Sequence, residues 1–212
     1  MVGKGVLLEC LDHPSIDKVL TVGRASVTME HPKLEQLVHK DFSDFSSISH
    51  QLEGYDACYL CMGVSAAGLN EKQYTTITYD YTLSLANELL KTSPEMTCTY
   101  VSGQGTDSTE KGRTMWARVK GKTENTLLQL GFKQAFMFRP GAIIPLRGIK
   151  SKTKLYQFFY DYFMWFLTIM KVLTPNSIVD TTQIVIAMIH ATRDGYKKNI
   201  ILPKDILTLS ER

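Results

Sequence analysis

Short apolar runs rich in β-branched and aromatic residues alternate with longer helix-like segments along the chain, and this alternation constrains the fold more than any other feature. The apolar runs predict strands at residues 18–22, 36–40, 56–61, 96–101, 134–138 and 198–202. The clearest helices are predicted at residues 71–91, 113–130, 152–173 and 181–193. Alternating strands and helices form a parallel sheet that helices cover on both faces. No repeat or Pro/Gly-rich linker divides the chain, so we expect one domain over residues 1–212.

Composition narrows the class of protein. With 44% hydrophobic and 21% charged residues, the chain is typical of a globular domain. The formal net charge of +3 is too small to argue for a nucleic-acid partner. Lys4 and Glu9 interrupt the N-terminal apolar run, which is therefore unlike a signal peptide. Four cysteines are too few for a disulfide scaffold at this length, so we expect a reducing, cytoplasmic setting.

In parallel sheets of this kind, ligands bind beyond the carboxyl ends of the strands. The loops that follow the first five predicted strands are all rich in small and polar residues, and they lie at residues 23–26, 41–44, 62–68, 102–112 and 139–145. Turn formation alone explains any one of these loops. All five together predict a rim that holds an extended ligand.

Three short motifs look like metal, redox or phosphate sites and are rejected. Cys58 and Cys61 lie three residues apart on a predicted strand, which points their side chains to opposite faces, so we expect core cysteines and no metal site. The Gly-Lys-Thr at residues 121–123 would need a glycine where Trp116 stands, and it falls inside a predicted helix. A dinucleotide fingerprint after the fourth strand would need a glycine at Ser108.

The segment at residues 150–173 joins a basic start to an aromatic, largely apolar helix. Asp161 and Lys171 interrupt it, and its apolar part is too short to span a membrane. We expect it to be buried in the core, to cover the site as a lid, or to form a subunit interface such as that of a homodimer. Binding to a membrane surface is a further alternative.

Five stretches together resemble the short-chain dehydrogenase/reductase superfamily. They are VGRAS (residues 22–26), DACYLCMGVS (56–65), YVSGQGTDS (100–108), RTMWARVKGKTEN (113–125) and FRPGAIIPL (138–146). The sequence is most similar to the atypical branch, near the Tat-interacting oxidoreductase-like proteins and bacterial proteins described as NAD-dependent epimerase/dehydratases. The resemblance implies an α/β fold with a Rossmann-type doubly wound parallel sheet that binds NAD or NADP.

That family pairs a serine at the end of one strand with a Tyr-x-x-x-Lys motif on the next helix. The resemblance implies that Ser102 is this serine and Lys120 this lysine, with Trp116 at the tyrosine position. In the family the tyrosine exchanges the proton of the substrate alcohol, the lysine lowers the tyrosine pKa and holds the nicotinamide ribose, and the serine binds the substrate oxygen. An indole N–H donates hydrogen bonds but does not titrate in the useful range. The motif therefore keeps its spacing and loses its acid.

Simple structural roles could explain the same three positions. Trp116 could pack against the sheet as readily as against a ligand, Ser102 could be a loop serine, and Lys120 a solvated helix lysine. If the chain nevertheless turns over substrate, Tyr79 or Tyr81 on the preceding helix is the next candidate proton donor.

The first residues read as a helix that resembles the first helix of the family, with Gly3 as the third glycine of its G-x-x-G-x-x-G loop. The strand and the two glycines that come earlier in the family are missing from the sequence. We therefore expect a sheet that lacks its first strand, and weak binding of either dinucleotide, because those glycines let the backbone reach the pyrophosphate.

Further positions carry the expected cofactor contacts. In the family, an acidic residue after the second strand binds the ribose 2′-OH and favours NAD. This chain has Arg24 at that place, which suits the 2′-phosphate of NADP. Alternatively, Arg24 is a solvated arginine in a loop. The resemblance implies an adenine contact at Asp41 and Phe42. It also implies cofactor contacts at Gly63, Lys120, Pro140 and Gly141.

The sequence thus predicts an NADP-linked oxidoreductase or epimerase homologue with an altered active site, acting on an unidentified small molecule. The first alternative is a non-catalytic module that senses the cofactor or binds a protein partner. The second is a membrane-surface adaptor that uses residues 150–173.

Overall fold

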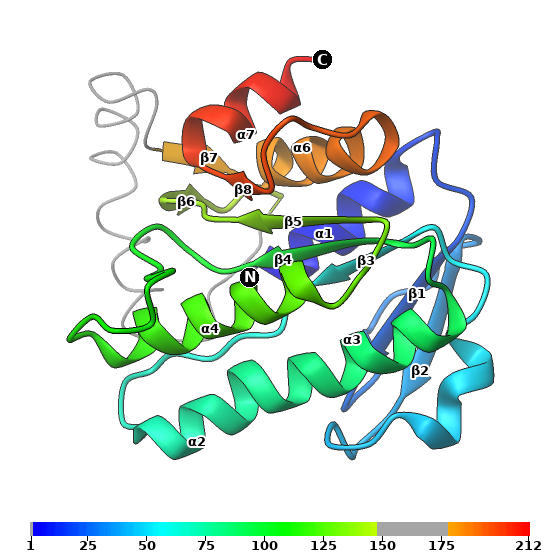
Figure 1. Ribbon diagram of the computed structural model, residues 1–212. Helices are drawn as coiled ribbons and strands as arrows, with labels where there is room; N and C mark the ends of the chain where they lie inside the picture. Colours follow the sequence, from blue (N-terminus) through cyan, green and yellow to red (C-terminus); the bar gives the residue numbers. More distant parts are fainter. Residues whose placement is uncertain (1, 148–177) are drawn as a thin grey trace.

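The computed structural model describes residues 2–147 and 178–212 (Figure 1). The helix predicted at residues 152–173, and with it the expectations for the segment at 150–173, lies outside the described residues. Within the described ranges, no helix is both long enough and apolar enough to cross a membrane.

Four parallel strands form the central sheet, in the order β3 (Ala57–Leu60), β4 (Thr97–Val101), β5 (Gln134–Phe138) and β8 (Ile200–Ile201). Their pairing places Cys58 opposite Cys98 and Cys98 opposite Ala135. Each strand falls within a range that the apolar runs predict, and four of the five residues of β4 are buried, as expected for a strand covered on both faces. The parallel α/β class is confirmed.

Strands β1 (Val19–Gly23) and β2 (Leu34–Val38) form a separate parallel pair. β2 begins and ends two residues earlier than the predicted strand at 36–40, because pairing starts where the Val19 N–H donates to the Lys33 carbonyl at 2.8 Å. Among the described residues, β1 pairs only with β2 and β3 only with β4. The place of the expected first strand, between β1 and β3, is thus not taken by any described strand.

Several short elements escaped prediction from the sequence. β6 (Ala142–Ile144) and β7 (Ile178–Asp180) pair in parallel, and each is only three residues long. A 3₁₀ helix spans Ser46–Gln51, and helix α7 (Pro203–Ser210) begins at a proline. Elements this short show too few periods of hydrophobic pattern to be recognised.

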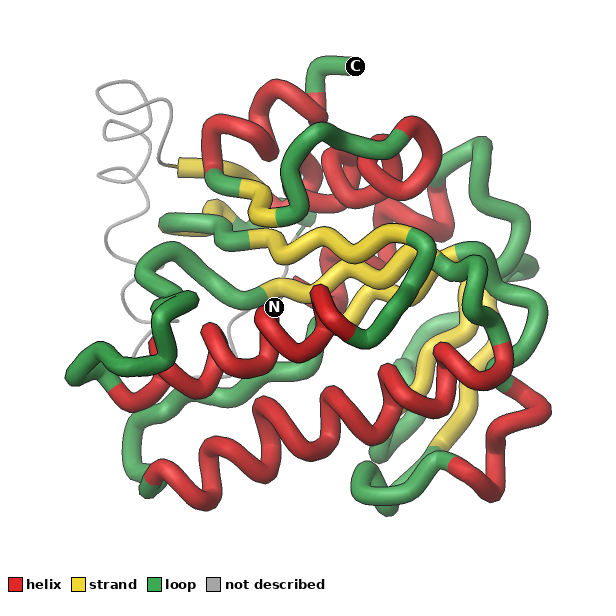
Figure 2. The backbone as a smooth tube through the Cα atoms, viewed as in Figure 1, coloured by secondary structure: helices red, strands yellow, loops and turns green. Residues whose placement is uncertain are grey.

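Helices cover both faces of the central sheet (Figures 1 and 2). α1 (Val2–Asp12), α6 (Thr181–Asp194) and α7 pack over one face. α3 (Tyr81–Thr92) and α4 (Met115–Gln129) pack over the other. The predicted helix at 71–91 is a continuous helical run in which a π-helical segment, Thr76–Asp80, joins α2 (Glu71–Thr75) to α3.

Side chains that alternate along the strands divide the interior into two cores. On β5, Met137 belongs to the core beneath α3 and α4, whereas Phe136 and Phe138 belong to the core beneath α1 and α6. Cys58 and Cys61 divide in the same way, Cys58 into the first core and Cys61 against the second. All four cysteines are free. The opposite orientation predicted for this pair is confirmed.

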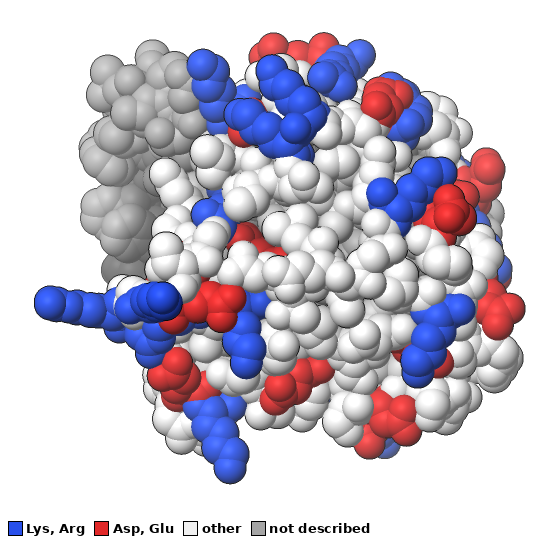
Figure 3. Space-filling view, in the orientation of Figure 1, with Lys and Arg blue, Asp and Glu red and all other residues white. Residues whose placement is uncertain are grey.

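Basic and acidic side chains are interspersed over the face shown in Figure 3. This mixed surface agrees with the small net charge of +3.

Candidate functional site

The end of β4 and the first turns of α4 bring three of the predicted residues together. Ser102 directly follows β4, and its backbone N–H donates to the Phe138 carbonyl at the end of β5, at 2.9 Å. Trp116 and Lys120 lie one turn apart at the start of α4. The Lys120 ammonium donates to the Ser102 carbonyl oxygen. The structure therefore places Ser102 and Lys120 in direct contact.

Trp116 lies against the loop that follows β4. A Cβ built on Gly105 would stand 3.3 Å from Cη2 of the indole. The backbone φ of Gly105 is +88°, a conformation that side chains disfavour. Glycine at this position thus lets the indole lie directly on the loop. The indole N–H has no hydrogen-bond partner among the described residues, so it is available to a ligand.

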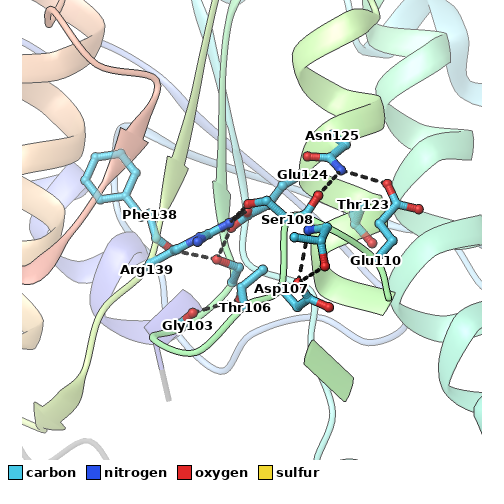
Figure 4. A network of polar contacts seen from close by, with 12 residues as sticks. Gly103, Thr106, Asp107, Ser108, Glu110, Thr123, Glu124, Asn125, Phe138 and Arg139 are labelled. Atoms are coloured by element: carbon cyan, nitrogen blue, oxygen red, sulfur yellow. Dashed lines mark hydrogen bonds and ion pairs between the residues drawn. The ribbon is translucent and has the colours of Figure 1, made fainter. Parts of the chain in front are cut away.

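Glu124, one turn after Lys120, is the centre of a buried polar network (Figure 4). Its side chain is fully buried, with 0% exposure. It accepts the hydroxyl hydrogen of Ser102 and is bridged by the Arg139 guanidinium, whose Nε lies 3.1 Å from each carboxylate oxygen. Arg139 also donates to the Ser108 hydroxyl at 2.5 Å. The network joins the ends of β4 and β5 to α4 and to the loop that connects β4 with α4.

This network changes what Ser102 can offer a ligand. The Ser102 hydroxyl has one hydrogen, and Glu124 and the Phe138 carbonyl (3.2 Å) are both placed to accept it. In this arrangement the hydroxyl presents lone pairs, rather than a hydrogen, to anything that binds above it. A carbonyl oxygen of a substrate would need another donor.

The loop between β4 and α4 is held by its own polar contacts. The Asp107 carboxylate accepts the N–H groups of Thr109 at 3.0 Å and of Gly112 at 2.7 Å. The hydroxyl of Thr109, with these N–H groups, lowers the pKa of Asp107 below its usual value. Asn125 on α4 donates to the Ser108 carbonyl at 2.9 Å. The loop is therefore held by its own Asp107 and tied to α4 at Ser108.

Lys120 is partly buried, and burial lowers its pKa to about 8, while the negative charge of Glu124 opposes the shift. Among the described residues, no carboxylate lies within ion-pair distance of its ammonium. Glu124 is already paired with Arg139. Lys120 consequently releases its proton closer to neutral pH than an ordinary lysine does.

The other predicted cofactor residues all lie near carboxyl ends of strands or at the start of α1. Arg24 directly follows β1, Gly63 follows β3, and Pro140 and Gly141 follow β5. The Arg24 side chain is exposed and makes no hydrogen bond or ion pair with any described residue. Around Gly63 nothing lies within 4 Å of a built Cβ, so this stretch borders open space.

Gly3 and the residues after β2 are more constrained. A Cβ on Gly3 would lie 3.3 Å from the Cβ of Cys61, so the first turn of α1 approaches the end of β3 closely. The Asp41 carboxylate is turned into its own loop, where it accepts the Ser43 N–H at 2.9 Å. The hydroxyl and N–H of Ser43 lower the pKa of Asp41. The ring of Phe42 lies 6.2 Å from the ring of Tyr81, centroid to centroid.

The two tyrosines named as alternative proton donors lie elsewhere. The Tyr79 hydroxyl pairs with the Thr126 hydroxyl at 3.4 Å, farther along α4. Tyr81 contacts Phe42. Among the described residues, neither tyrosine hydroxyl forms a hydrogen bond with Ser102.

Sequence reasoning missed Glu124 and Arg139. Glu124 stands four residues after Lys120, so it continues the face that begins at Trp116, and this spacing could have indicated it. Arg139 lies in the FRPGAIIPL stretch. A helical glutamate and an arginine after a strand are usually solvated, and only the fold shows that the two meet in the interior.

Comparison with known proteins agrees with this arrangement. No protein-family model matches the chain. The chain is 26% identical to Protein HTATIP2 of Rattus norvegicus over 144 residues, which cover 67% of this chain and 58% of that protein. It is 28% identical to Protein fmp52-2, mitochondrial, of Aspergillus terreus over 159 residues, which cover 74% of this chain and 68% of that protein. The chain thus spans less than two thirds of the length of HTATIP2.

A solved structure is similar over most of the chain. UDP-N-acetylglucosamine 4-epimerase from Methanobrevibacter ruminantium M1 superposes with a TM-score of 0.66 at 13% identity, covering 94% of this chain and 71% of that one. This likeness shows the fold, a Rossmann-type α/β sheet. The chain is thus similar in sequence to HTATIP2 and fmp52-2, and its fold is the Rossmann-type α/β fold of the epimerase.

Proposed function

We propose that the chain binds a nicotinamide dinucleotide, NADP in preference to NAD, along the carboxyl ends of its parallel strands and acts as an oxidoreductase- or epimerase-like protein. The observation that carries the proposal is the contact between Ser102 at the end of β4 and Lys120 on α4, with Trp116 one turn earlier. A bound dinucleotide would supply or accept the hydride. Binding, orientation and proton exchange fall to the residues of this chain.

Three features fit such a cofactor. Arg24 is an exposed cation without a partner among the described residues, directly after β1. Gly63 borders open space after β3. The close approach of Gly3 to Cys61 is the helix–strand packing that the third glycine of a dinucleotide loop provides.

These positions suggest the orientation of the ligand. Arg24 would hold the 2′-phosphate and Phe42 would border the adenine. Lys120 would hold the nicotinamide ribose beside Pro140 and Gly141. Asp41 supports the expected adenine contact less well, because its carboxylate already accepts hydrogen bonds from the N–H and hydroxyl of Ser43.

Arg24→Ala tests cofactor choice. We expect the parent chain to bind NADPH more tightly than NADH, with weak binding of both, and the variant to lose about 10- to 150-fold in NADPH affinity, the value of a charged hydrogen bond. Titration calorimetry or the fluorescence of the reduced dinucleotide measures both affinities. Arg193→Ala is the control for the loss of an exposed arginine, because Arg193 lies in the last turn of α6 and pairs there with Asp194. Equal affinity of the parent for NADPH and NADH would contradict the preference.

A non-catalytic role is the second candidate. Trp116 stands in place of the acid, and the Ser102 hydroxyl gives its hydrogen to Glu124. A protein that senses the dinucleotide or binds a partner would bind NADPH without oxidising it in the presence of carbonyl compounds. Binding of NADPH without its oxidation distinguishes this candidate from the first.

We also propose that residues 1–212 act as one domain in a reducing compartment. The four free cysteines support a reducing setting. Because the similar fmp52-2 is named as mitochondrial, fractionation of cells should compare the cytoplasm with mitochondria.

A further inference from the structure

Most polar side chains around Ser102 have no proton to give to a ligand. The Ser102 hydroxyl hydrogen is donated to Glu124, which is fully buried. The guanidinium of Arg139 is committed to Glu124 and Ser108, and an indole N–H such as that of Trp116 is a hydrogen-bond donor only. A reduction at this site still needs an acid, because the oxygen of a reduced carbonyl takes up a proton.

Among the residues that the structure describes, Lys120 is the remaining acid beside Ser102. Its ammonium donates to a backbone acceptor, the Ser102 carbonyl, and lies 4.0 Å from the position that a Cβ on Gly103 would take. The carboxylate whose charge acts on it, Glu124, is held by Arg139. An ammonium that is partly buried and lacks a carboxylate partner is poorly stabilised in its charged form.

We propose that Lys120 is itself the proton donor of this site, and that its ligand is an aldehyde or ketone whose carbonyl oxygen replaces the Ser102 carbonyl as the acceptor of the ammonium. The inference rests on the proposed function. The carbonyl carbon gains a hydride from the reduced dinucleotide, and the π electron pair of the carbonyl takes the proton from Nζ. The neutral amine left behind regains a proton from water.

The electrostatic surroundings of Lys120 agree with this role. Burial lowers its pKa to about 8, so at pH 7 the group is mostly protonated and a much stronger acid than an ordinary lysine. Among the described residues, the charged groups that face it are Glu124 on its own helix and, beyond that carboxylate, Arg139 at the end of β5. Glu71 on the adjoining α2 pairs instead with Arg118 at 2.8 Å. The Lys120 ammonium itself contacts the carbonyl oxygen of Ser102, and Gly103 lies beside it.

The first test needs no dinucleotide. Brief acylation of the native protein with trace acetic anhydride at a series of pH values, read by mass spectrometry, reports the neutral fraction of each lysine. We expect half-maximal labelling of Lys120 near pH 8. Lys122, exposed on the same helix, serves as the internal reference. A midpoint for Lys120 near pH 10, as for an ordinary lysine, would overturn the proposal.

The second test separates charge from proton donation. Lys120→Arg keeps a positive charge but holds its protons, so NADPH binding should change by less than about threefold, whereas NADPH oxidation with a panel of aldehydes and ketones should fall about 10²- to 10⁴-fold. Lys122→Arg should leave both unchanged. In the parent, turnover should decline as pH rises above about 8, where the donor loses its proton.

The outcomes are distinguishable. If the parent does not bind NADPH, the proposed function fails and this inference falls with it. If NADPH binds and Lys120→Arg turns over normally, the inference alone is overturned. If NADPH binds and the parent reduces none of the carbonyl compounds, the inference is again overturned and the non-catalytic candidate is favoured.

Discussion

Gly121 of α4 and Asp107 of the preceding loop approach so closely that a Cβ on Gly121 would stand 1.8 Å from the Asp107 carbonyl oxygen. The Asp107 N–H also donates to the Ala117 carbonyl one turn earlier, at 3.0 Å. The loop therefore lies directly on the backbone of the helix that carries Trp116 and Lys120. This contact explains why a glycine stands in the interior of a helix, where it would otherwise cost stability.

Gly121→Ala should therefore destabilise the fold despite the better helix propensity of alanine. We expect a loss of about 1–3 kcal/mol in the free energy of unfolding, the usual cost of an added group in a filled space. Urea denaturation followed by circular dichroism measures it. Lys122→Ala, at the exposed neighbouring position, is the control. A stabilised Gly121→Ala variant would show that the loop moves away freely.

Removal of the charge of Glu124 alone should lower the free energy of unfolding more than removal of both Glu124 and Arg139. Glu124→Leu leaves the largely buried Arg139 guanidinium without a carboxylate partner, which typically costs about 3–5 kcal/mol. The double variant Glu124→Leu with Arg139→Met should recover most of that loss, because apolar residues of similar volume can replace a buried ion pair. Chemical denaturation of both single variants and the double variant gives the coupling energy. Additive losses would contradict the network as described.

The lowered pKa of Lys120 makes stability depend on pH. The unfolded chain binds this proton up to about pH 10.4, whereas the folded chain releases it near pH 8. Between these values the unfolded state binds more protons, so the contribution of this lysine to stability rises with pH and is least favourable below about pH 8. Lys120→Met should thus be more stable than the parent at pH 7, by about 1–3 kcal/mol before the lost hydrogen bond is counted.

The measurement is the difference in unfolding free energy between parent and Lys120→Met at pH 7 and at pH 10.5. The advantage of the variant should shrink at the higher pH. Lys122→Met controls for the loss of a positive charge on the same helix. An advantage that is the same at both pH values would show that the ammonium is well solvated.

Trp116→Tyr should restore a titrating acid one turn from Lys120. The ammonium should lower the pKa of the new phenol, and general acid catalysis is typically worth about 10²- to 10⁴-fold. NADPH oxidation across a panel of carbonyl compounds compares the parent, Trp116→Tyr and the double change with Lys120→Ala, in which the gain should disappear. Failure of Trp116→Tyr to raise turnover above that of the parent, with NADPH demonstrably bound, would indicate that a phenol at this position does not reach the substrate oxygen.

The sequence was informative where a pattern repeats or where a motif has fixed spacing. The buried runs at β3, β4 and β5 and the long helices α4 and α6 are predictable, because each extends through several periods of apolar residues. The same spacing places Trp116 and Lys120 on one face. The commitment of the Ser102 hydroxyl to Glu124 was not predictable, because it depends on Arg139, which reaches α4 from the end of another strand.

A sheet without its first strand was expected from the sequence, but whether the gap beside β1 would stay open was not. The amides of β1 bond to β2, and those of β3 to β4, among the described residues. Two strands alone form a marginal structure in water, so the β1–β2 pair depends on side chains such as Leu20, Val22 and Leu37 that pack against the neighbouring core. In native-state hydrogen exchange the β1–β2 amides should open as a unit of lower free energy than those of β4 and β5. The part of the molecule that carries Arg24 would then open and close independently of the part that carries Lys120.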